Sequence, residues 1–178
     1  MTYIAMLRGI NVSGKKIIKM EQLRASLSAL GFSNVKTYVQ SGNIILESSI
    51  GSPASLSMKI EQKILRDFGF TVPVFLRTPI EMAGAIKCNP FINDPNIDQS
   101  KLHITFLAAA PPKTALEQLQ PLAVEPERFR IIGREIFLYC PNGYGNTKLS
   151  NTAIEKKLSI GATTRNWTTS KTLLAMAQ

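Results

Sequence analysis

In the first 78 residues, two kinds of hydrophobic pattern alternate along the chain. Continuous apolar runs of four to six residues predict strands, and apolar residues spaced three and four apart predict helices. Ser52 followed by Pro53 is a typical helix start, and Gly31 and Gly69 are typical helix ends. The predicted elements are, in order, a strand at residues 3–7, a helix at 20–30, strands at 35–40 and 43–47, a helix at 53–68 and a strand at 72–76.

The remaining residues return to the same order after a proline-rich stretch. Residues 78–100 contain three prolines, which indicates a connection, with a short helix at 81–87. Two strands at 128–132 and 135–139 read as a hairpin that turns at Gly133. The predicted elements of this half are a strand at residues 102–107, a helix at 113–119, the hairpin, a helix at 148–158 and a final helix at 168–176.

The order strand, helix, strand, strand, helix, strand is that of the ferredoxin-like motif, an antiparallel sheet with two helices on one face. We therefore expect an α+β protein of two ferredoxin-like halves, the second lacking its last strand and ending in a helix. Residues 60–64 (Ile-Glu-Gln-Lys-Ile) resemble 154–158 (Ile-Glu-Lys-Lys-Leu), which favours an internal duplication. The expected organisation is an N-terminal half at 1–78, a connection at 79–100 and a C-terminal half at 101–178.

The composition of the chain excludes several classes of protein. The longest stretch without a charge is residues 136–147, which is too short and too polar to cross a bilayer, and no leader pattern precedes Arg8. We expect a cytosolic protein that does not bind membranes. Cys88 and Cys140 match no paired-cysteine motif, and His103 is the single histidine, so we expect no metal, no cofactor and no disulfide.

Basic residues concentrate near the two ends of the chain. The formal net charge is +9, and residues 1–40 contribute +5 while residues 141–178 contribute +4, so the middle hundred residues are neutral. This distribution indicates either two solvated basic faces or one anion-binding surface to which both ends contribute.

The loop after the first strand contains the first candidate site. Arg8, Asn11, Lys15 and Lys16 lie among glycines before a predicted helix start, where backbone amides favour an anion and lysines oppose the helix dipole. The loop is not a Walker A motif. The alternative interpretation is a solvated basic loop.

Three polar residues lie at the tip of the first hairpin, and the second half contains two further polar segments. Gln40, Ser41 and Asn43 are candidate ligand contacts, although simple turn chemistry also explains them. Lys148 follows a glycine-rich turn at a predicted helix start, where a structural cap is the alternative. The candidates just before the last helix are Thr164, Arg165, Asn166 and Trp167. Arginine suits phosphate and tryptophan offers a stacking face, but a buried Trp167 and an internal salt bridge of Arg165 are the structural alternatives.

Several motifs in order along the chain identify a family. They are Leu-Arg-Gly-Ile-Asn-Val at 7–12, Leu-Gly-Phe at 30–32, Thr-Tyr-Val-Gln-Ser-Gly-Asn-Ile at 37–44, Val-Pro-Val at 72–74, Asn-Pro-Phe at 89–91, Leu-His-Ile at 102–104, Gly-x-Gly-x-Thr-Lys-Leu at 143–149 and Ala-Thr-Thr-Arg-Asn-Trp at 162–167. Together they resemble the bacterial domain of unknown function 1697 family. The resemblance implies a small cytosolic protein with two ferredoxin-like halves and implies no particular reaction. Ser13, Thr147 and the residues at 159–161 depart slightly from the family pattern.

No set of nucleophile, base and orienting residue is recognisable. The leading hypothesis is therefore binding of a phosphate-bearing small molecule or a nucleic acid where the first loop meets the Arg165 segment. Base stacking on the sheet, as in RNA-recognition motifs, is disfavoured because the central strands lack the required aromatic residues. One alternative is an enzyme acting on a phosphorylated or acyl substrate, with Arg8 and Arg165 as clamps and Lys148 or Ser41 as the reactive group. The other is a scaffold that associates through strand edges. The oligomeric state is open.

Overall fold

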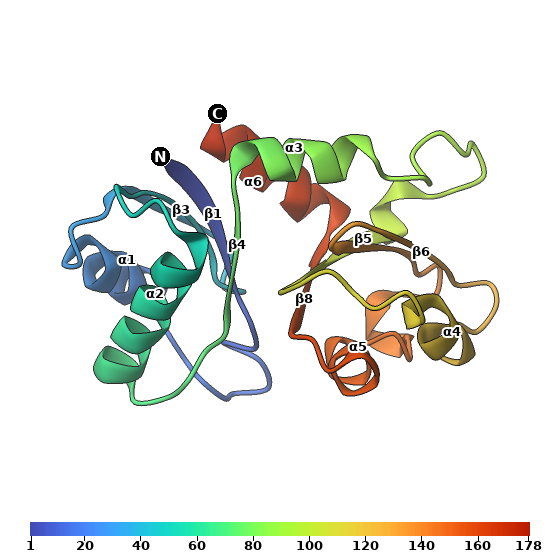
Figure 1. Cartoon of the computed structure of the whole chain (residues 1–178), viewed down its shortest axis with the longest axis horizontal. Helices are drawn as coiled ribbons and strands as arrows, with labels where there is room; N and C mark the ends of the chain where they lie inside the picture. The colour runs from blue at the N-terminus through green and yellow to red at the C-terminus, as the bar shows by residue number, and fades with distance from the viewer. The chain divides into compact units, whose positions relative to one another are not determined.

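The computed structural model describes all 178 residues and contains two four-stranded antiparallel sheets and six helices (Figure 1). The predicted α+β class is confirmed. The strands are β1 (Thr2–Leu7), β2 (Ser33–Tyr38), β3 (Asn43–Glu47), β4 (Val74–Arg77), β5 (Leu102–Leu107), β6 (Arg128–Ile132), β7 (Glu135–Tyr139) and β8 (Ala162–Asn166). The helices are α1 (Met20–Ser28), α2 (Pro53–Phe68), α3 (Pro79–Lys87), α4 (Ala115–Leu119), α5 (Asn151–Leu158) and α6 (Trp167–Ala177).

The chain divides into two compact units, each with one of the sheets. Unit 1 comprises Met1–Ala83 with Leu173–Gln178, and unit 2 comprises Gly84–Thr172. No helix in either unit is long and apolar enough to cross a membrane.

The sheet of unit 1 has the strand order β2-β3-β1-β4, and α1 and α2 cover one of its faces (Figure 1). The core on this face is built by alternate residues of β1 and by the apolar stripes of the two helices, because a strand turns every second side chain to the same side. Ser52 caps α2 by accepting from Ser55 N at 3.3 Å, and Gly69 ends it at φ 81°. Sequence rules for helix ends therefore located α2 correctly.

The link between β2 and β3 is longer than the two residues, 41 and 42, that separate the predicted strands at 35–40 and 43–47. β2 ends at Tyr38, and residues 39–42 form the link, in which Val39 has φ 50° and Gly42 has φ 77°. A β-branched residue with positive φ is a strained conformation, which sequence patterns do not predict.

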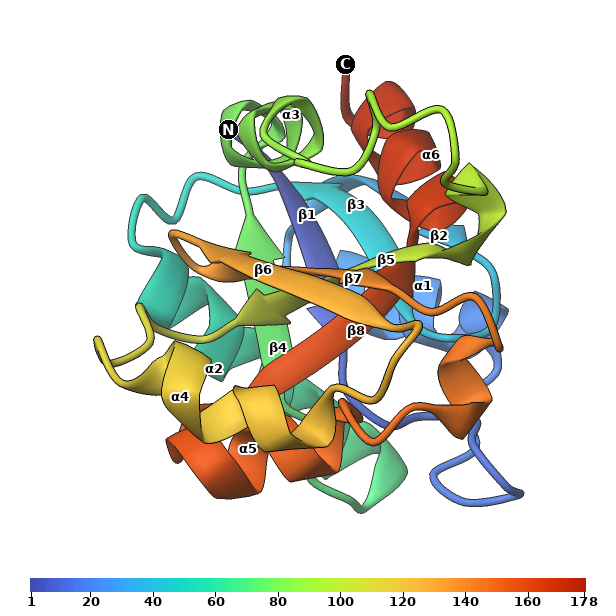
Figure 2. The same ribbon diagram turned by 90° about the vertical axis from the view of Figure 1, so that its right-hand side faces the viewer.

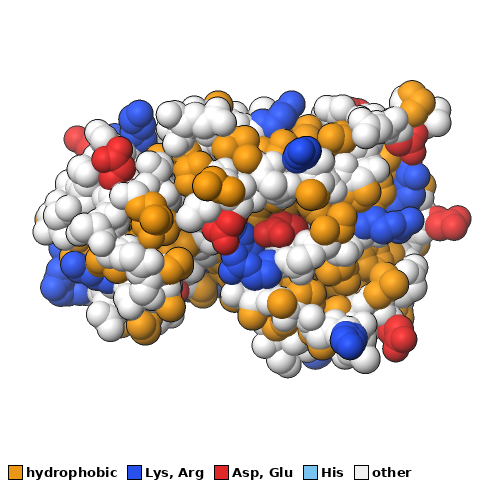
Figure 3. All heavy atoms as spheres, turned by 45° about the horizontal axis from the view of Figure 1, so that its top comes forward, with side chains coloured by type: hydrophobic (Ala, Val, Ile, Leu, Met, Phe, Trp, Pro, Cys, Tyr) orange, Lys and Arg blue, Asp and Glu red, His pale blue; other side chains and the backbone are white.

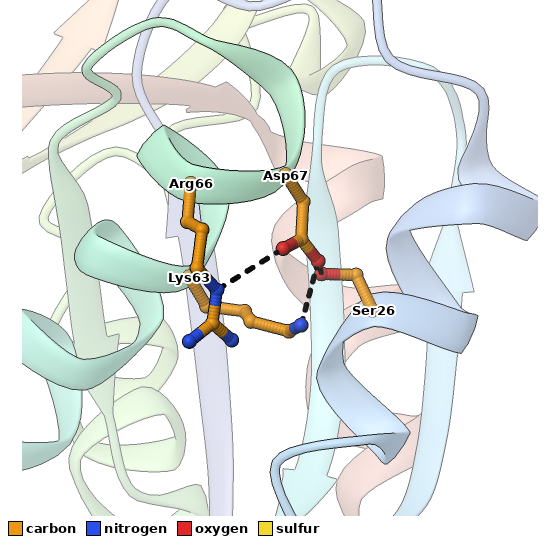
Figure 4. A network of polar contacts seen from close by, with 4 residues as sticks. All are labelled: Ser26, Lys63, Arg66 and Asp67. Carbon is orange, nitrogen blue, oxygen red and sulfur yellow. Dashed lines mark hydrogen bonds and ion pairs between the residues drawn. The ribbon is translucent and has the colours of Figure 1, made fainter.

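A polar network joins α1 to α2 (Figure 4). The Ser26 hydroxyl donates to Asp67 Oδ2 at 2.6 Å, and the Lys63 ammonium lies 2.7 Å from the same oxygen. Arg66 Nε lies 3.4 Å from Asp67 Oδ1. These partners stabilise the ionised carboxylate, with Lys63 making the largest contribution, and they lower the pKa of Asp67 from 3.8 to about 2.

Replacing Lys63 by methionine should raise the pKa of Asp67 toward 3.8. The native pKa lies below the unfolded value, so the contribution of Asp67 to stability is present above about pH 4 and is lost as the pH falls toward 2. A carboxyl carbon NMR titration measures this pKa, and Lys59→Met on the same helix is the control. A wild-type Asp67 that titrates near 3.8 would contradict the prediction.

The sheet of unit 2 has the order β6-β7-β5-β8, and α4 and α5 lie against one of its faces (Figure 2). The core on this face includes Leu107, Ile136 and Leu138 from the strands and Ile154 and Leu158 from α5. The strands β5, β6 and β7 have the bounds that the apolar pattern predicts.

Two expectations for unit 2 were wrong. First, the unit does have a fourth strand, β8, so its order is β-α-β-β-α-β rather than β-α-β-β-α followed directly by a helix. Its residues Ala-Thr-Thr-Arg-Asn lack apolar alternation, and only the β-branched threonines signal a strand. Second, α5 begins at Asn151 instead of near Lys148, because the Ser150 hydroxyl accepts from Ala153 N at 3.3 Å and so caps the helix.

Candidate functional site

The loop between β1 and α1, residues 8–19 of unit 1, has an unusual backbone. Five of its residues have positive φ: Gly9 at 74°, Asn11 at 53°, Ser13 at 50°, Gly14 at 72° and Lys16 at 48°. Glycine adopts this conformation freely, but each of the other residues does so at a cost of about 1 kcal/mol. Strained backbone of this kind persists only where surrounding contacts hold it, and it is concentrated at functional sites.

Asn11 supplies those contacts. Its side-chain amide donates to Ile18 O at 3.0 Å and to Gln40 O at 2.7 Å, and its Oδ1 accepts from Ile18 N at 2.9 Å. Both ends of the amide are therefore engaged with the backbone. The sequence placed Asn11 among the ligand contacts, and the geometry places it as the residue that closes the loop.

Two other segments of unit 1 hold the loop. Leu7 N donates to Gly42 O at 2.8 Å, which joins the end of β1 to the link 39–42. Arg8 N donates to Pro73 O at 3.0 Å, and Lys16 Nζ donates to Thr71 O at 2.7 Å, which joins the loop to the segment before β4. The candidate residues Arg8, Asn11, Lys16, Gln40 and Ser41 are thus brought to one edge of unit 1.

The link 39–42 contributes two kinds of residue to this edge. Gln40 and Ser41 are exposed, so their side chains are accessible to a ligand. Asn43 is 0% exposed, and its Nδ2 donates to Tyr38 O and to Ser41 Oγ, each at 3.0 Å. Asn43 therefore stabilises the turn, as the structural alternative for this residue predicted.

The edge is strongly basic. Residues 1–20 include four basic side chains and no acidic one. Lys15 is exposed near the tip of the loop, and Lys19 is exposed at the start of α1, where no side chain caps the helix. Glu21 is the one acidic residue in the first turn. A helix N-terminus attracts anions and repels cations, so an anion bound here would offset the unfavourable position of the lysines.

The segment around Lys148 in unit 2 has different electrostatics. Lys148 is exposed and lines a hollow of about 190 Å³ together with Asn142, Asn146 and two glutamates, Glu125 and Glu127. Two carboxylates beside one ammonium oppose the binding of a further anion. The Thr147 hydroxyl donates to Glu127 at 2.9 Å and accepts from Leu149 N at 3.0 Å, so it organises the turn.

Thr164 and Asn166 in unit 2 are committed to internal hydrogen bonds. The Thr164 hydroxyl donates to Asn151 Oδ1 at 2.7 Å and lies 2.7 Å from the Thr105 hydroxyl, and it accepts from the Tyr144 hydroxyl at 3.1 Å. A hydroxyl has one proton and two acceptor positions, so Thr164 is saturated. Asn166 Oδ1 accepts from Thr169 N at 2.7 Å and caps the first turn of α6.

Arg165 and Trp167 are both buried, at 8% and 5% exposure. Arg165 Nη1 donates to Thr163 Oγ1 and to Thr164 O, each at 2.9 Å. The Lys171 ammonium lies 5.7 Å from the centre of the Trp167 ring. Neither side chain is presented on the surface, and the burial of Trp167 matches its alternative role as a core residue.

His103 and Cys140 both lie in surroundings that disfavour their charged forms. His103 stacks on Tyr144 with ring centroids 4.9 Å apart, and burial lowers the pKa of His103. Burial raises the pKa of the Cys140 thiol to about 11, so it stays protonated at neutral pH and is a poor nucleophile. No three His, Cys, Asp or Glu side chains lie together as metal ligands.

The candidate residues fall into two sets. Those from Arg8 to Asn43 belong to unit 1, and those from Lys148 to Trp167 belong to unit 2. Sequence reasoning missed Thr71 and Pro73, whose backbone carbonyls hold the loop. Their side chains carry no signal for this role, because the contact is made by main-chain oxygens far along the chain.

Fold and site define an α+β protein of two four-stranded antiparallel sheets with a constrained basic loop. The same fold occurs in a conserved bacterial protein from Streptococcus pneumoniae, SP0830, whose structure aligns with a TM-score of 0.78 at 22% identity over 99% of this chain and 98% of that one.

Residues 1–137 match the family model described as protein of unknown function (DUF1697), so the chain belongs to this family. The match includes the loop 8–19 and ends within β7. No curated protein matches the chain.

Proposed function

We propose that the loop 8–19 of unit 1 binds the phosphate group of an anionic small molecule. The observation that carries the proposal is the concentration of left-handed backbone in the one loop that also holds Arg8, Lys15 and Lys16. Successive residues of opposite backbone handedness turn their amides toward one side and form anion-binding concavities. The side chain of Asn11 holds this backbone in place before a ligand arrives, which lowers the entropic cost of binding.

A small phosphate-bearing molecule fits these features better than a nucleic acid. Nucleic-acid interfaces need extended positive surface or exposed aromatic residues on a sheet. Ile4, Met6 and Ile45 occupy the sheet face opposite to α1 and α2, and all three are buried. Acidic as well as basic side chains lie on the face that Figure 3 draws.

Lys15→Met should weaken the binding of inorganic phosphate about five- to thirtyfold, because a charge-assisted hydrogen bond contributes about 1–2 kcal/mol. Lys15 Nζ makes no internal bond, so the variant should fold normally. Amide chemical-shift titration with phosphate at constant ionic strength measures the affinity and reports which residues respond. Lys148→Met in unit 2 is the matched control and should leave the affinity unchanged.

Equal losses of phosphate affinity in Lys15→Met and Lys148→Met would rule out the loop as the site. Amide chemical-shift changes confined to unit 2 would also rule it out. Short single-stranded RNA at two salt concentrations provides the comparison ligand. RNA that binds more tightly than phosphate and loses affinity steeply with salt would replace the small-molecule proposal with nucleic-acid binding.

We also infer that each unit is a ferredoxin-like module and that the two arose by duplication. Ile4 pairs with Arg77 in unit 1, and Ile104 pairs with Arg165 in unit 2. Each of these arginines is buried and donates to the carbonyl of the residue before it at 2.9 Å.

The resemblance between residues 60–64 and 154–158 has a matching contact. Glu61 Oε1 accepts from Val74 N at 2.8 Å, and Glu155 Oε1 accepts from Ala162 N at 3.1 Å, so each glutamate binds the first residue of the fourth strand in its unit. Main-chain superposition of one unit on the other should align Glu61 with Glu155 and Arg77 with Arg165. A best superposition that aligns other positions would argue against duplication.

A further inference from the structure

An open hollow of about 250 Å³ lies on unit 1 between α2 and the segment that leads into β4. Its lining residues are Glu61, Gln62, Leu65, Thr71, Val72 and Pro73. Leu65 is 46% exposed, whereas Leu56, Ile60 and Ile64 of the same helix are buried, so its side chain is available to the hollow. The volume is of the order that a single aromatic ring needs, since an apolar cavity of about 150 Å³ holds benzene.

The basic loop borders this hollow. Lys16 Nζ donates to the carbonyl of Thr71 at 2.7 Å, and the backbone amide of Arg8 donates to the carbonyl of Pro73 at 3.0 Å. Both acceptors belong to residues that line the hollow. The Lys16 ammonium is therefore bound to the backbone of a residue that lines the hollow.

The polar residues of the hollow define the opposite end of a ligand. Glu61 Oε1 accepts from Val74 N at 2.8 Å, which fixes the carboxylate beside the hollow, and no cationic side chain forms an ion pair with it. A carboxylate repels phosphate, so the charged end of a ligand belongs at Lys16 and its uncharged end belongs near Glu61. Leu65, Val72 and Pro73 supply apolar contact between the two ends.

We infer that the hollow holds the ring of a phosphate monoester whose phosphate group is bound by the loop 8–19. This inference rests on the proposed function and adds the class of ligand to it: a phosphorylated compound with one apolar ring, too small to be a dinucleotide. When the ligand binds, the Lys16 ammonium would exchange its bond to the Thr71 carbonyl for a bond to the phosphate. The flexible lysine side chain can reach both acceptors.

Phenyl phosphate and inorganic phosphate are the probes, titrated separately into the intact protein and followed by amide chemical shifts. Phenyl phosphate should bind about tenfold more tightly, because it buries a ring against apolar side chains. Leu65→Ser should remove most of this advantage and leave the affinity for inorganic phosphate unchanged. Lys16→Met should weaken the binding of both probes. Leu116→Ser, which replaces an exposed leucine of α4 in unit 2, is the matched control.

The outcomes separate the two proposals. If phenyl phosphate binds no more tightly than phosphate, or if Leu65→Ser leaves its advantage intact, the ring site is wrong and phosphate binding by the loop stands. If neither probe binds, both proposals fall. If Leu65→Ser weakens both probes equally, the hollow does not recognise the ring, which also overturns the inference.

Discussion

Replacing Gly42 by alanine should lower the free energy of unfolding by about 2–4 kcal/mol. Gly42 has φ 77°, a conformation that costs an alanine about 1 kcal/mol. A methyl group at this position would also lie 2.7 Å from Ile10 Cδ1 and 2.8 Å from Leu7 Cβ. Leu7 Cβ is fixed to the backbone of β1, so the strand or the link 39–42 has to move. Equilibrium urea unfolding measures the loss.

Gly14→Ala is the matched control for this effect. Gly14 has a similar φ of 72°, but no atom lies within 4 Å of the position that a methyl group would occupy. In Gly14→Ala the free energy of unfolding should therefore fall only by the conformational cost of placing alanine at a positive φ, about 1 kcal/mol. Equal losses of unfolding free energy in Gly42→Ala and Gly14→Ala would show that the contacts of Gly42 with Leu7 and Ile10 do not constrain the link.

Asn11→Ala should lower the free energy of unfolding by about 2–3 kcal/mol, because it removes three hydrogen bonds and places alanine at a φ of 53°. It should also weaken the binding of inorganic phosphate, since the loop loses the contacts that hold its backbone. Urea unfolding gives the stability, and hydrogen exchange of the Ile18 amide shows whether the loop opens locally.

Asn34→Ala provides the comparison for Asn11. Asn34 also has a positive φ, of 51°, and its side chain makes one hydrogen bond, to Glu47 at 2.8 Å. Its replacement should cost about 1 kcal/mol and should not change phosphate binding. If Asn11→Ala behaves like Asn34→Ala in both measurements, Asn11 does not organise the loop.

Elements with a regular apolar period were predictable from the sequence. The strands β1 and β7 follow short apolar runs, β5 and β6 alternate apolar with polar residues, and α2 has both a cap and a terminal glycine, so local chemistry determines where each lies. The strand β8 was missed because its buried positions are polar: Thr163 and Arg165 replace the apolar residues that the pattern requires. Its hydrogen bonds come from β5, sixty residues earlier in the chain.

The candidate site was predictable only in part, because some of its features follow from local sequence and others depend on tertiary contacts. Charge and glycine content identify the loop 8–19 from local sequence alone. The roles of Asn11 and Asn43 depend on carbonyl groups that the fold brings close, and the burial of Arg165 and Trp167 depends on tertiary packing. Residue type indicates what chemistry a side chain offers, but only the fold shows whether that chemistry is already used internally.

The contacts of Arg8 and Lys16 with Pro73 and Thr71 affect when the site becomes competent during synthesis. The loop 8–19 leaves the ribosome early, yet its anchors at 71 and 73 follow more than fifty residues later. Until then the nascent loop lacks two of the bonds that hold it, and the contacts of Asn11 with Ile18 and Gln40 compensate its strained conformation only in part. Binding of phosphate by a growing chain should begin only after β4 has joined the sheet, so ligand affinity would report assembly of the first four-stranded sheet.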